Sequence, residues 1–369
     1  MEQIIYSGDG SIRELARIID GQFKRIFLVT GRDSYGNSGA ARAVEDLFKG
    51  LSRVEWARFS EFAVNPSLED ARRGVDAFRK FDPDLVLAIG GGSVLDMAKL
   101  IKTLAPHGDE GFETLVKTAA VDRPCLPMVA VPTTAGSGSE ATHFAVAYVE
   151  KQKFSLAHGS LLPRWVILDS DFLRGASPRQ MACSGMDALS QAVESFWNKS
   201  ATSESRKFAI RAMEAILPAI EAAVAGSDKK AHQAMLQGAH LAGRAINMTK
   251  TTAPHALSYT LTTHHGIPHG HAVALILGKF FEINWELANV PERASLAELH
   301  GLLGGENAKD CRRIWYGLME KIGLATDMES LGLTAPESVG AIVDKVNVER
   351  LANHPVPLTR EDLARVFQG

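Results

Sequence analysis

Cysteine is scarce in this sequence, which has only Cys125, Cys183 and Cys311 in 369 residues. They are too few and too widely spaced for a disulfide framework or for a zinc site made of cysteines. We therefore expect three reduced side chains, buried as small hydrophobic residues in the reducing cytoplasm.

An excess of charge of either sign is also missing. The chain has 40 Lys and Arg against 43 Asp and Glu, a formal net charge of −3, and its isoelectric point is near 6.5. Nucleic acids and anionic membranes are bound through basic surfaces, so this balance argues against both partners and favours a small molecule. Any preference for an anionic substrate must then come from a few local residues.

Long hydrophobic runs are absent as well. No uninterrupted apolar stretch reaches the roughly 20 residues that a membrane-spanning helix needs. The first residues, MEQIIYSGDG, lack a basic region followed by an apolar stretch, so we expect no secretory signal. With 46% hydrophobic and 22% charged residues, the sequence predicts a globular protein, and its length favours two domains.

The pattern of the sequence changes near residue 180. Before it, β-branched runs predict strands at 24–31, 83–93 and 126–134, and helical spacing predicts a helix at 68–81. This alternation indicates a parallel sheet covered on both faces. After it, patterns with a period of 3.6 residues predict helices at 186–197, 204–225 and 228–247. We expect an α/β domain that binds a dinucleotide over 1–180 and an all-α domain over 181–369.

Two loops at strand ends suggest where a nucleotide binds. Gly90, Gly91 and Gly92 would let backbone N–H groups approach a pyrophosphate at the start of the next helix. Their spacing departs from GxGxxG, so a plain strand-to-helix turn is the alternative. The second loop, VPTTAGSGSEAT (131–142), is rich in hydroxyl groups. Two such loops are what a dinucleotide site in an open α/β sheet requires.

The end of the first predicted strand bears on which dinucleotide binds. A carboxylate there would read the ribose of NADH and repel the 2′-phosphate of NADPH, but the sequence has Gly31 and Arg32. This favours NADPH; NADH is the alternative if Arg32 is an ordinary surface residue. The expected cofactor residues are Gly31, Arg32, Gly90, Gly91, Gly92, Ser93, Asp96, Thr133, Thr134 and Ser137.

Asp187 and Gln191 are four residues apart in a predicted helix, so both lie on one face of it. An aspartate in an apolar stretch is costly to bury without a cation or hydrogen-bond donors. A metal site and a hydrogen-bonded buried carboxylate are therefore the two interpretations of Asp187.

The histidines in HALSYTLTTHHGIPHGHAVAL (255–275) favour the metal. The Gly-Ile-Pro break at 266–268 places His255 on one helix and His269 in the first turn of the next, with Pro268 at the first helical position. The helix dipole there favours the neutral imidazole that a metal requires. With Asp187, these two histidines would leave an open position for Lewis-acid catalysis.

Three other histidines lie in the same stretch. His264 and His265 stand where the first of these helices should end, and capping and solvent contact explain them. His271 points to another side of its helix than His269, and we expect it to line the substrate site.

Four stretches, in this order, resemble the iron-containing (group III) metal-dependent alcohol dehydrogenases: GGGSVLDMAK, PTTAGSGSEAT, GMDALSQAVES and HALSYTLTTHHGIPHG. The similarity covers essentially the whole chain. It implies a dinucleotide-binding N-terminal domain, a helical C-terminal domain that binds metal and substrate, and a divalent metal in the cleft between them. The family's usual ligands, one Asp and three His, fall on Asp187, Gln191, His255 and His269.

Gln191 departs from the pattern of that family, in which many iron-dependent members have histidine. A carboxamide oxygen is a weaker ligand than imidazole, although related glycerol dehydrogenases use one Asp and two His for zinc. We expect Fe²⁺, with Zn²⁺ as the alternative, because intrinsic affinity alone does not decide between them.

Within the family, EATHFAVAYVEKQKFSLAHGSLLP and TKTTAPHALSY resemble the phosphonoacetaldehyde reductases, which make 2-hydroxyethylphosphonate in phosphonate natural-product pathways. The resemblance implies reduction of a small aldehyde to a primary alcohol with NAD(P)H. A general alcohol or polyol dehydrogenase and a lyase like dehydroquinate synthase are the alternatives. A homodimer is compatible with each of them.

A phosphonate needs cations and hydrogen-bond donors around it. Arg244 and Lys250 precede His255 in the sequence; the alternative for both is a solvated position at a helix end. His271 is a candidate proton relay, and Tyr259, one turn after His255, is a candidate neighbour of the nicotinamide or the substrate. The expected substrate residues are Arg244, Asn247, Lys250 and His143.

Overall fold

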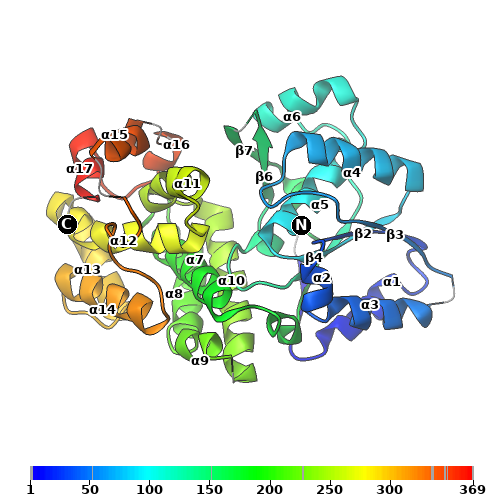
Figure 1. The fold of residues 1–369 in the computed structure, drawn as a ribbon, viewed down its shortest axis with the longest axis horizontal. Helices are drawn as coiled ribbons and strands as arrows, with labels where there is room; N and C mark the ends of the chain where they lie inside the picture. Colours follow the sequence, from blue (N-terminus) through cyan, green and yellow to red (C-terminus); the bar gives the residue numbers. More distant parts are fainter. Residues whose placement is uncertain are drawn as a thin grey trace. The chain divides into compact units, whose positions relative to one another are not determined.

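The computed structural model describes residues 3–51, 53–150, 152–226, 228–333, 336–344, 346 and 348–367. The chain divides into two compact units, Met1–Ala176 and Ser177–Gly369. The first is an α/β unit and the second is built from helices, so the predicted fold class is confirmed (Figure 1). No helix in the described ranges is long and apolar enough to cross a membrane.

Six parallel strands form the main sheet of the first unit, in the order β1-β8-β5-β4-β2-β3. They are β1 (Ile4–Ser7), β2 (Arg25–Thr30), β3 (Glu55–Phe59), β4 (Leu85–Gly90), β5 (Met128–Pro132) and β8 (Trp165–Leu168). The predicted strands are β2, β4 and β5, and nearly every residue in them is buried. Continuous apolar runs of this kind are typical of a parallel sheet covered on both faces.

Helices cover both faces of this sheet (Figure 1). They are α1 (Glu14–Ile19), α2 (Ser34–Asn37), α3 (Ala40–Lys49), α4 (Leu68–Phe81), α5 (Gly92–Leu104) and α6 (Phe112–Thr118). Side chains alternate along β2, so Phe27 and Val29 pack with α4, α5 and α6 on one face, whereas Ile26 and Leu28 pack with α1 and α3 on the other. The helix predicted at 68–81 is α4.

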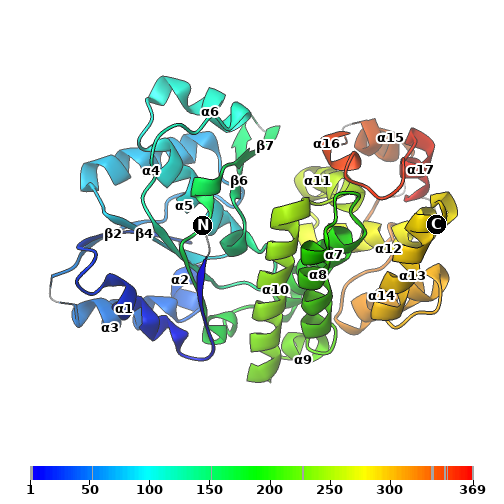
Figure 2. The same ribbon diagram turned by 180° about the vertical axis from the view of Figure 1, so that it is seen from behind.

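An antiparallel hairpin of β6 (Phe144–Val149) and β7 (Gln152–Ala157) follows the second hydroxyl-rich loop. Strand β6 packs on α5 and strand β7 on α6, as Figure 2 shows from behind. The sequence patterns did not predict this hairpin. It holds the chain that leaves the loop against α5.

The second unit has no strand among its described residues. Its helices are α7 (Pro178–Trp197), α8 (Ser203–Ile216), α9 (Ile220–Val224), α10 (Lys229–Thr249), α11 (Ala253–His265), α12 (His269–Leu287), α13 (Val290–Leu302), α14 (Ala308–Lys321), α15 (Pro336–Asp344), α16 (Val348–Leu351) and α17 (Arg360–Arg365). The pattern over 204–225 was expected to be one helix. It is divided into α8 and α9, and Pro218, which cannot continue the hydrogen-bond ladder, lies at the break.

Helix α7 is the centre of this unit. From Met181 to Trp197 every residue except Ser184 is buried, and α8, α10 and α12 pack around the helix. Polar side chains on α7 are therefore removed from water, and each needs a partner within the protein.

Candidate functional site

Three side chains from three helices of the second unit converge: Asp187 of α7, His255 of α11 and His269 of α12. Each offers one ligand atom, and these atoms lie within 4.8 Å of one another. Asp187 Oδ1 is 3.3 Å from His255 Nε2 and 3.9 Å from His269 Nε2. Asp187 and His255 are buried, whereas 35% of the His269 side chain is exposed. The group can therefore be reached from solvent on the His269 side.

The chemistry of this group fits a divalent cation. Asp187 Oδ1 is buried and makes no hydrogen bond of acceptable geometry, although both imidazole Nε2 atoms face it. A buried carboxylate oxygen left in this way is costly. One carboxylate and two imidazoles are a donor set that binds zinc or iron, and a cation would bond to the carboxylate and to both rings.

Gln191 lies one helical turn after Asp187 on α7 and is buried. Its side chain forms a hydrogen bond with Asp187. The carboxamide therefore contributes to holding the carboxylate.

Glu194, which the sequence reasoning missed, is the completely buried residue that holds His255. Its carboxylate accepts hydrogen bonds from the backbone N–H of Thr252 (3.0 Å), from Thr252 Oγ1 (2.8 Å) and from the backbone N–H of His255 (3.3 Å). It also accepts one from His255 Nδ1. A proton fixed on Nδ1 leaves Nε2 as the nitrogen that faces Asp187, as is usual for histidines that bind metals.

The charges around His255 are unusual for a buried imidazole. Burial disfavours its charged form, but the carboxylate of Glu194, together with that of Asp187, outweighs burial and raises the pKa of His255 to about 10. The two carboxylates thus create a site that attracts positive charge. The spacing of Asp187, Gln191 and Glu194, at i, i+4 and i+7 on one helix face, was the signal that could have identified Glu194.

Close contact between α12 and α7 brings His269 to this group. A Cβ atom on Gly270 would lie 1.9 Å from the carbonyl oxygen of Cys183 and 2.8 Å from Cβ of Asp187. Only glycine allows the two backbones to approach so closely. Pro268 was expected to be the first residue of this helix. It is instead the N-cap residue of α12, and His269 is the first residue.

Other residues predicted for this site lie around it. The ring of Tyr259 stacks on that of His269, with centroids 5.9 Å apart and planes at 17°. His271 is buried, and its Nε2 donates a hydrogen bond to the carbonyl of Ala325 at 2.8 Å. Its burial lowers the pKa of the ring. His264 and His265 are exposed at the end of α11, where Gly266 caps the helix with φ 68°.

The predicted substrate residues lie on different elements of the two units. The guanidinium group of Arg244 lies over the ring of Phe208 on α8, 4.1 Å from its centroid. Asn247 is on the last turns of α10, and Lys250 follows that helix as an exposed residue with φ 62°. His143 belongs to the first unit, where its ring contacts Phe144 beside β6.

The two predicted nucleotide loops meet in the first unit. Gly90 ends β4, Gly91 caps α5, and the backbone N–H of Thr133 donates to the carbonyl of Gly90 at 3.0 Å. A Cβ atom on Gly91 would lie 3.2 Å from Thr134, and one on Gly92 would lie 2.6 Å from Ser137 Oγ. Gly92 therefore allows the hydroxyl-rich loop to pack against the start of α5, and at Gly91 a side chain would have little room.

Ser93 and Asp96 make contacts within this unit. Ser93 Oγ accepts a hydrogen bond from the backbone N–H of Asn65. Asp96 Oδ1 accepts one from Ser139 Oγ, and Oδ2 accepts one from the backbone N–H of Val146. Asp96 therefore links α5 to the hydroxyl-rich loop and to β6.

Gly31 and Arg32 follow β2, and Arg32 is exposed. A second arginine, which the sequence reasoning missed, reaches the same place from β3. Arg58 donates hydrogen bonds to Thr30 Oγ1 (2.8 Å) and to the carbonyls of Gly31 (3.0 Å) and Arg32 (3.1 Å). The guanidinium group of Arg58 thus lies at the end of β2, bonded to the backbone of Arg32.

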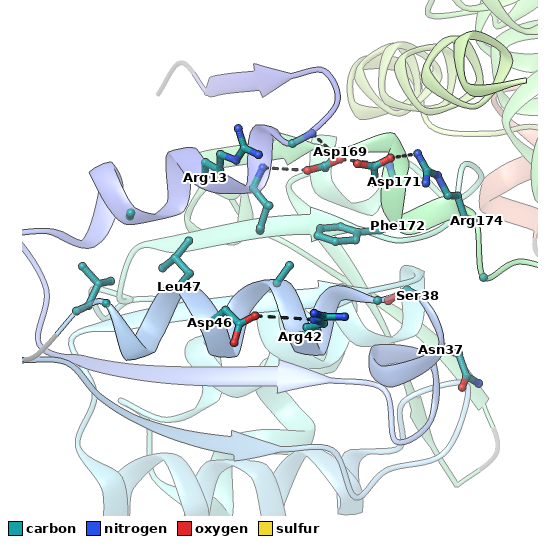
Figure 3. Close-up of a pocket in the computed structure, with 18 residues that line it drawn as sticks. Arg13, Asn37, Ser38, Arg42, Asp46, Leu47, Asp169, Asp171, Phe172 and Arg174 are labelled. Carbon is teal, nitrogen blue, oxygen red and sulfur yellow. Dashed lines mark hydrogen bonds and ion pairs between the residues drawn. The ribbon is translucent and has the colours of Figure 1, made fainter.

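A pocket of about 1190 Å³ lies elsewhere in the first unit, beside α1 and α3 (Figure 3). Four of its charged residues form two ion pairs, Arg42 with Asp46 and Arg174 with Asp171. Asp169 in its wall accepts hydrogen bonds from backbone N–H groups of Gly10 and Ile12. None of the predicted site residues lines it.

Known proteins match this chain over both units. The model of the family "Iron-containing alcohol dehydrogenase" matches residues 2–170, and that of "Fe-containing alcohol dehydrogenase family, C-terminal" matches residues 181–369. Long-chain-alcohol dehydrogenase 1 of Geobacillus thermodenitrificans is 30% identical over 84% of this chain and 81% of its own length. Phosphonoacetaldehyde reductase of Streptomyces viridochromogenes is 31% identical over 78% of this chain and 76% of its own.

A solved structure is similar as well. Sulfoacetaldehyde reductase from Bifidobacterium kashiwanohense, in complex with NAD⁺, has a TM-score of 0.89 and 29% identity, over 99% of this chain and 96% of its own. The family predicted from the sequence is thus confirmed. The chain belongs to the iron-containing alcohol dehydrogenase family and is an NAD(P)-linked alcohol dehydrogenase or aldehyde reductase.

Proposed function

We propose that this enzyme reduces a small aldehyde to a primary alcohol with NAD(P)H, at a divalent metal held by Asp187, His255 and His269. The observation that carries the proposal is the convergence of these three side chains, whose ligand atoms all lie within 4.8 Å of one another around a buried carboxylate. The proposed roles of the units follow from it. Residues 1–180 would bind the dinucleotide, and residues 181–369 would bind the metal and the substrate.

A divalent metal supplies Lewis acidity that polarises a carbonyl group and stabilises the developing alkoxide. The protein's part is to hold the ligand atoms in place. Glu194 keeps the proton of His255 on Nδ1, and Gln191 holds Asp187 by a hydrogen bond. The ring of Tyr259 stacks on that of His269 and so helps to orient it.

The metal we favour is Fe²⁺, with Zn²⁺ as the alternative. Gln191 stands where many iron-dependent family members have histidine, and its side chain already has Asp187 as a partner. The proposed site therefore has three strong ligands and Gln191 beside them. A three-ligand site with an open position suits either metal.

The cofactor we favour is NADPH. Arg32 is exposed, and Arg58 is held against the carbonyls of Gly31 and Arg32. An exposed arginine after β2 and the Arg58 guanidinium group beside its backbone favour a 2′-phosphate, because arginine binds phosphate oxygens by charged hydrogen bonds. NADH is the alternative, since the similar sulfoacetaldehyde reductase structure contains NAD⁺.

The substrate we favour is phosphonoacetaldehyde. Two of the similar proteins are named for acetaldehydes that carry an anionic group, phosphonoacetaldehyde reductase and sulfoacetaldehyde reductase. Lys250 is the better of the two candidate cations, because it lies two residues before Thr252, which is bonded to Glu194. Arg244 instead stacks on Phe208. Its role would be to shape α10 against α8.

A general alcohol dehydrogenase is the second candidate. Long-chain-alcohol dehydrogenase 1 is as similar to this chain as the phosphonoacetaldehyde reductase is, and 35% exposure of His269 is compatible with a longer substrate. For an uncharged substrate Lys250 would have no partner in the reaction.

A comparison of aldehydes tests the substrate. In Fe²⁺- or Zn²⁺-loaded enzyme, NADPH oxidation should have a higher kcat/KM with phosphonoacetaldehyde than with uncharged aldehydes of similar length. Lys250→Ala should lower this value about tenfold for the phosphonate, the cost of one charged hydrogen bond, and leave it unchanged for the others. A preference for uncharged aldehydes contradicts the phosphonate proposal, and no oxidation of NADPH or NADH with any small aldehyde contradicts the reductase.

Substitution of the ligands tests the metal site. Asp187→Ala and His269→Ala should each abolish metal retention after desalting, measured by mass spectrometry of the metals, because each removes one of three ligands. His265→Ala is the matched control: this histidine is exposed at the end of α11, and its removal should leave the metal content unchanged. Full retention in either ligand variant removes that residue from the site.

Glu194→Gln tests the support of His255. The change keeps the size of the side chain but removes the charge, so His255 Nδ1 loses a charged acceptor. Metal affinity, measured by competition with a chelator, should fall about 10- to 100-fold. Thr252→Ala, which loses a bond to Glu194 but keeps the contact between Glu194 and His255, should have a smaller effect. Equal affinities in wild type and Glu194→Gln would rule out this role of Glu194.

A further inference from the structure

Helix α5 carries two buried lysines, Lys99 and Lys102, which are 0% and 2% exposed. Neither belongs to the residues expected to contact the cofactor. Lysine is almost never fully buried unless its ammonium group is bonded inside the protein. What each ammonium group bonds to is therefore informative.

The ammonium group of Lys99 is surrounded by the end of the hydroxyl-rich loop. It donates to the carbonyl oxygens of Ser139 (2.5 Å), Thr142 (2.8 Å) and Phe144 (2.9 Å). The hydroxyl oxygens of Ser139 and Thr142 are both 3.1 Å away. All of these acceptors lie between residues 139 and 144, where the chain has a 3₁₀ turn at Ser139–Ala141 and then enters β6.

These three carbonyls lie where the chain changes from an irregular loop to a strand. Buried carbonyl groups need donors, and an ammonium group has three hydrogens to offer. Lys99 therefore donates to three carbonyls within one short segment, residues 139–144. A hydrophobic side chain would fill the same space but remove all of the bonds from the ammonium group, at a cost for each. Thr142 Oγ1 would still donate to the carbonyls of Ser139 (3.3 Å) and Phe144 (3.5 Å).

Lys99 is part of a row of contacts along one face of α5. Gly92 faces Ser137, whose Oγ would be 2.6 Å from a Cβ atom at Gly92. Asp96 binds Ser139 Oγ and the backbone N–H of Val146. On α5, Gly92, Asp96 and Lys99 are at i, i+4 and i+7, so they share a face of the helix. The loop is thus fastened to α5 at each turn, from the glycines at its start to Lys99.

We propose that Lys99 is a positioning residue of the dinucleotide site. By bonding the end of the loop it fixes the shape in which Thr133, Thr134 and Ser137 stand beside Gly90 to Gly92. Lys99 itself does not touch the dinucleotide. The inference rests on the proposed function of this loop in dinucleotide binding.

Lys102 provides a matched comparison. It lies three residues further along α5, and burial lowers the pKa of both lysines to about 8. Its ammonium group donates to the carbonyls of Leu126 (3.0 Å) and Ser160 (2.6 Å), and neither belongs to the hydroxyl-rich loop. Loss of Lys102, like loss of Lys99, removes hydrogen bonds from a buried ammonium group to backbone carbonyls. It leaves the bonds between Lys99 and the hydroxyl-rich loop in place.

The test compares Lys99→Met with Lys102→Met in the full chain. Both changes should lower the thermal midpoint, because each removes hydrogen bonds from a buried ammonium group to backbone carbonyls. Only Lys99→Met should weaken binding of NADPH and NADH, by about tenfold or more, measured by titration calorimetry. With Lys102→Met the affinity should stay within about twofold of wild type. Metal affinity and kcat at saturating dinucleotide should stay close to wild type in both.

The outcomes separate this inference from the function on which it rests. Equal dinucleotide affinities in Lys99→Met and Lys102→Met, with wild type binding normally, overturn the role of Lys99 and leave the proposed function intact. A wild-type protein that binds neither NADPH nor NADH overturns both. If Lys99→Met does not fold, Lys99→Gln and Lys102→Gln, which each keep a donor, are compared in the same way with the same expected difference.

Discussion

Two carboxylates buried on one face of α7 are the constraint on which the second unit depends. Asp187 and Glu194 lie in a helix whose residues are nearly all removed from water, and each must be compensated within the protein. Glu194 receives the first N–H groups of α11 and the Nδ1 hydrogen of His255. Glu194 therefore contributes to fixing the start of α11 and the orientation of the His255 ring. The charge of Asp187 is compensated only in part. Its Oδ1 atom lies where His255 and His269 meet, so a cation bound there would complete the compensation.

This arrangement depends on a small residue as much as on charged ones. Gly270 lets the start of α12 approach the backbone of α7 to a distance that a Cβ atom would forbid. His269, next to it, is thereby placed beside Asp187. The site is thus held by the packing of three helices, and a metal would add to this packing a bond from each of them.

The first unit uses the same physical principle in a different place. Helix α5 buries polar side chains along one face, and their partners lie in the hydroxyl-rich loop and at the start of β6. Asp96 and Lys99 supply acceptors and donors to this loop. In both units, then, a buried helix holds polar groups that fix the backbone of a neighbouring segment.

The sequence predicted those parts of the fold whose pattern is unambiguous. The strands β2, β4 and β5 are continuous apolar runs because they are covered on both faces. The edge strands β1 and β3 were missed, since they are short and largely exposed, and so was the hairpin of β6 and β7. Pro218 marks the break in the second helical pattern, which periodicity alone did not show.

For the site, the sequence identified residues whose chemistry is unusual for their surroundings. Asp187, His255 and His269 were chosen in this way, and the structure brings them together. Glu194 and Lys99 were overlooked because a single charged residue in a helical pattern is usually on the surface. Their partners are 58 and 40 or more residues away in the chain, so only the fold shows what they bind. Arg58 was overlooked for the same reason: it reaches Gly31 from a neighbouring strand.

X-ray absorption of the iron- or zinc-loaded enzyme tests the central claim most directly, because the fine structure beyond the metal edge reports which atoms are bonded to the metal. A site made by Asp187, His255 and His269 predicts two imidazole nitrogens, oxygen ligands for the rest, and no sulfur. A spectrum with three imidazoles, with none, or with a thiolate ligand would contradict it.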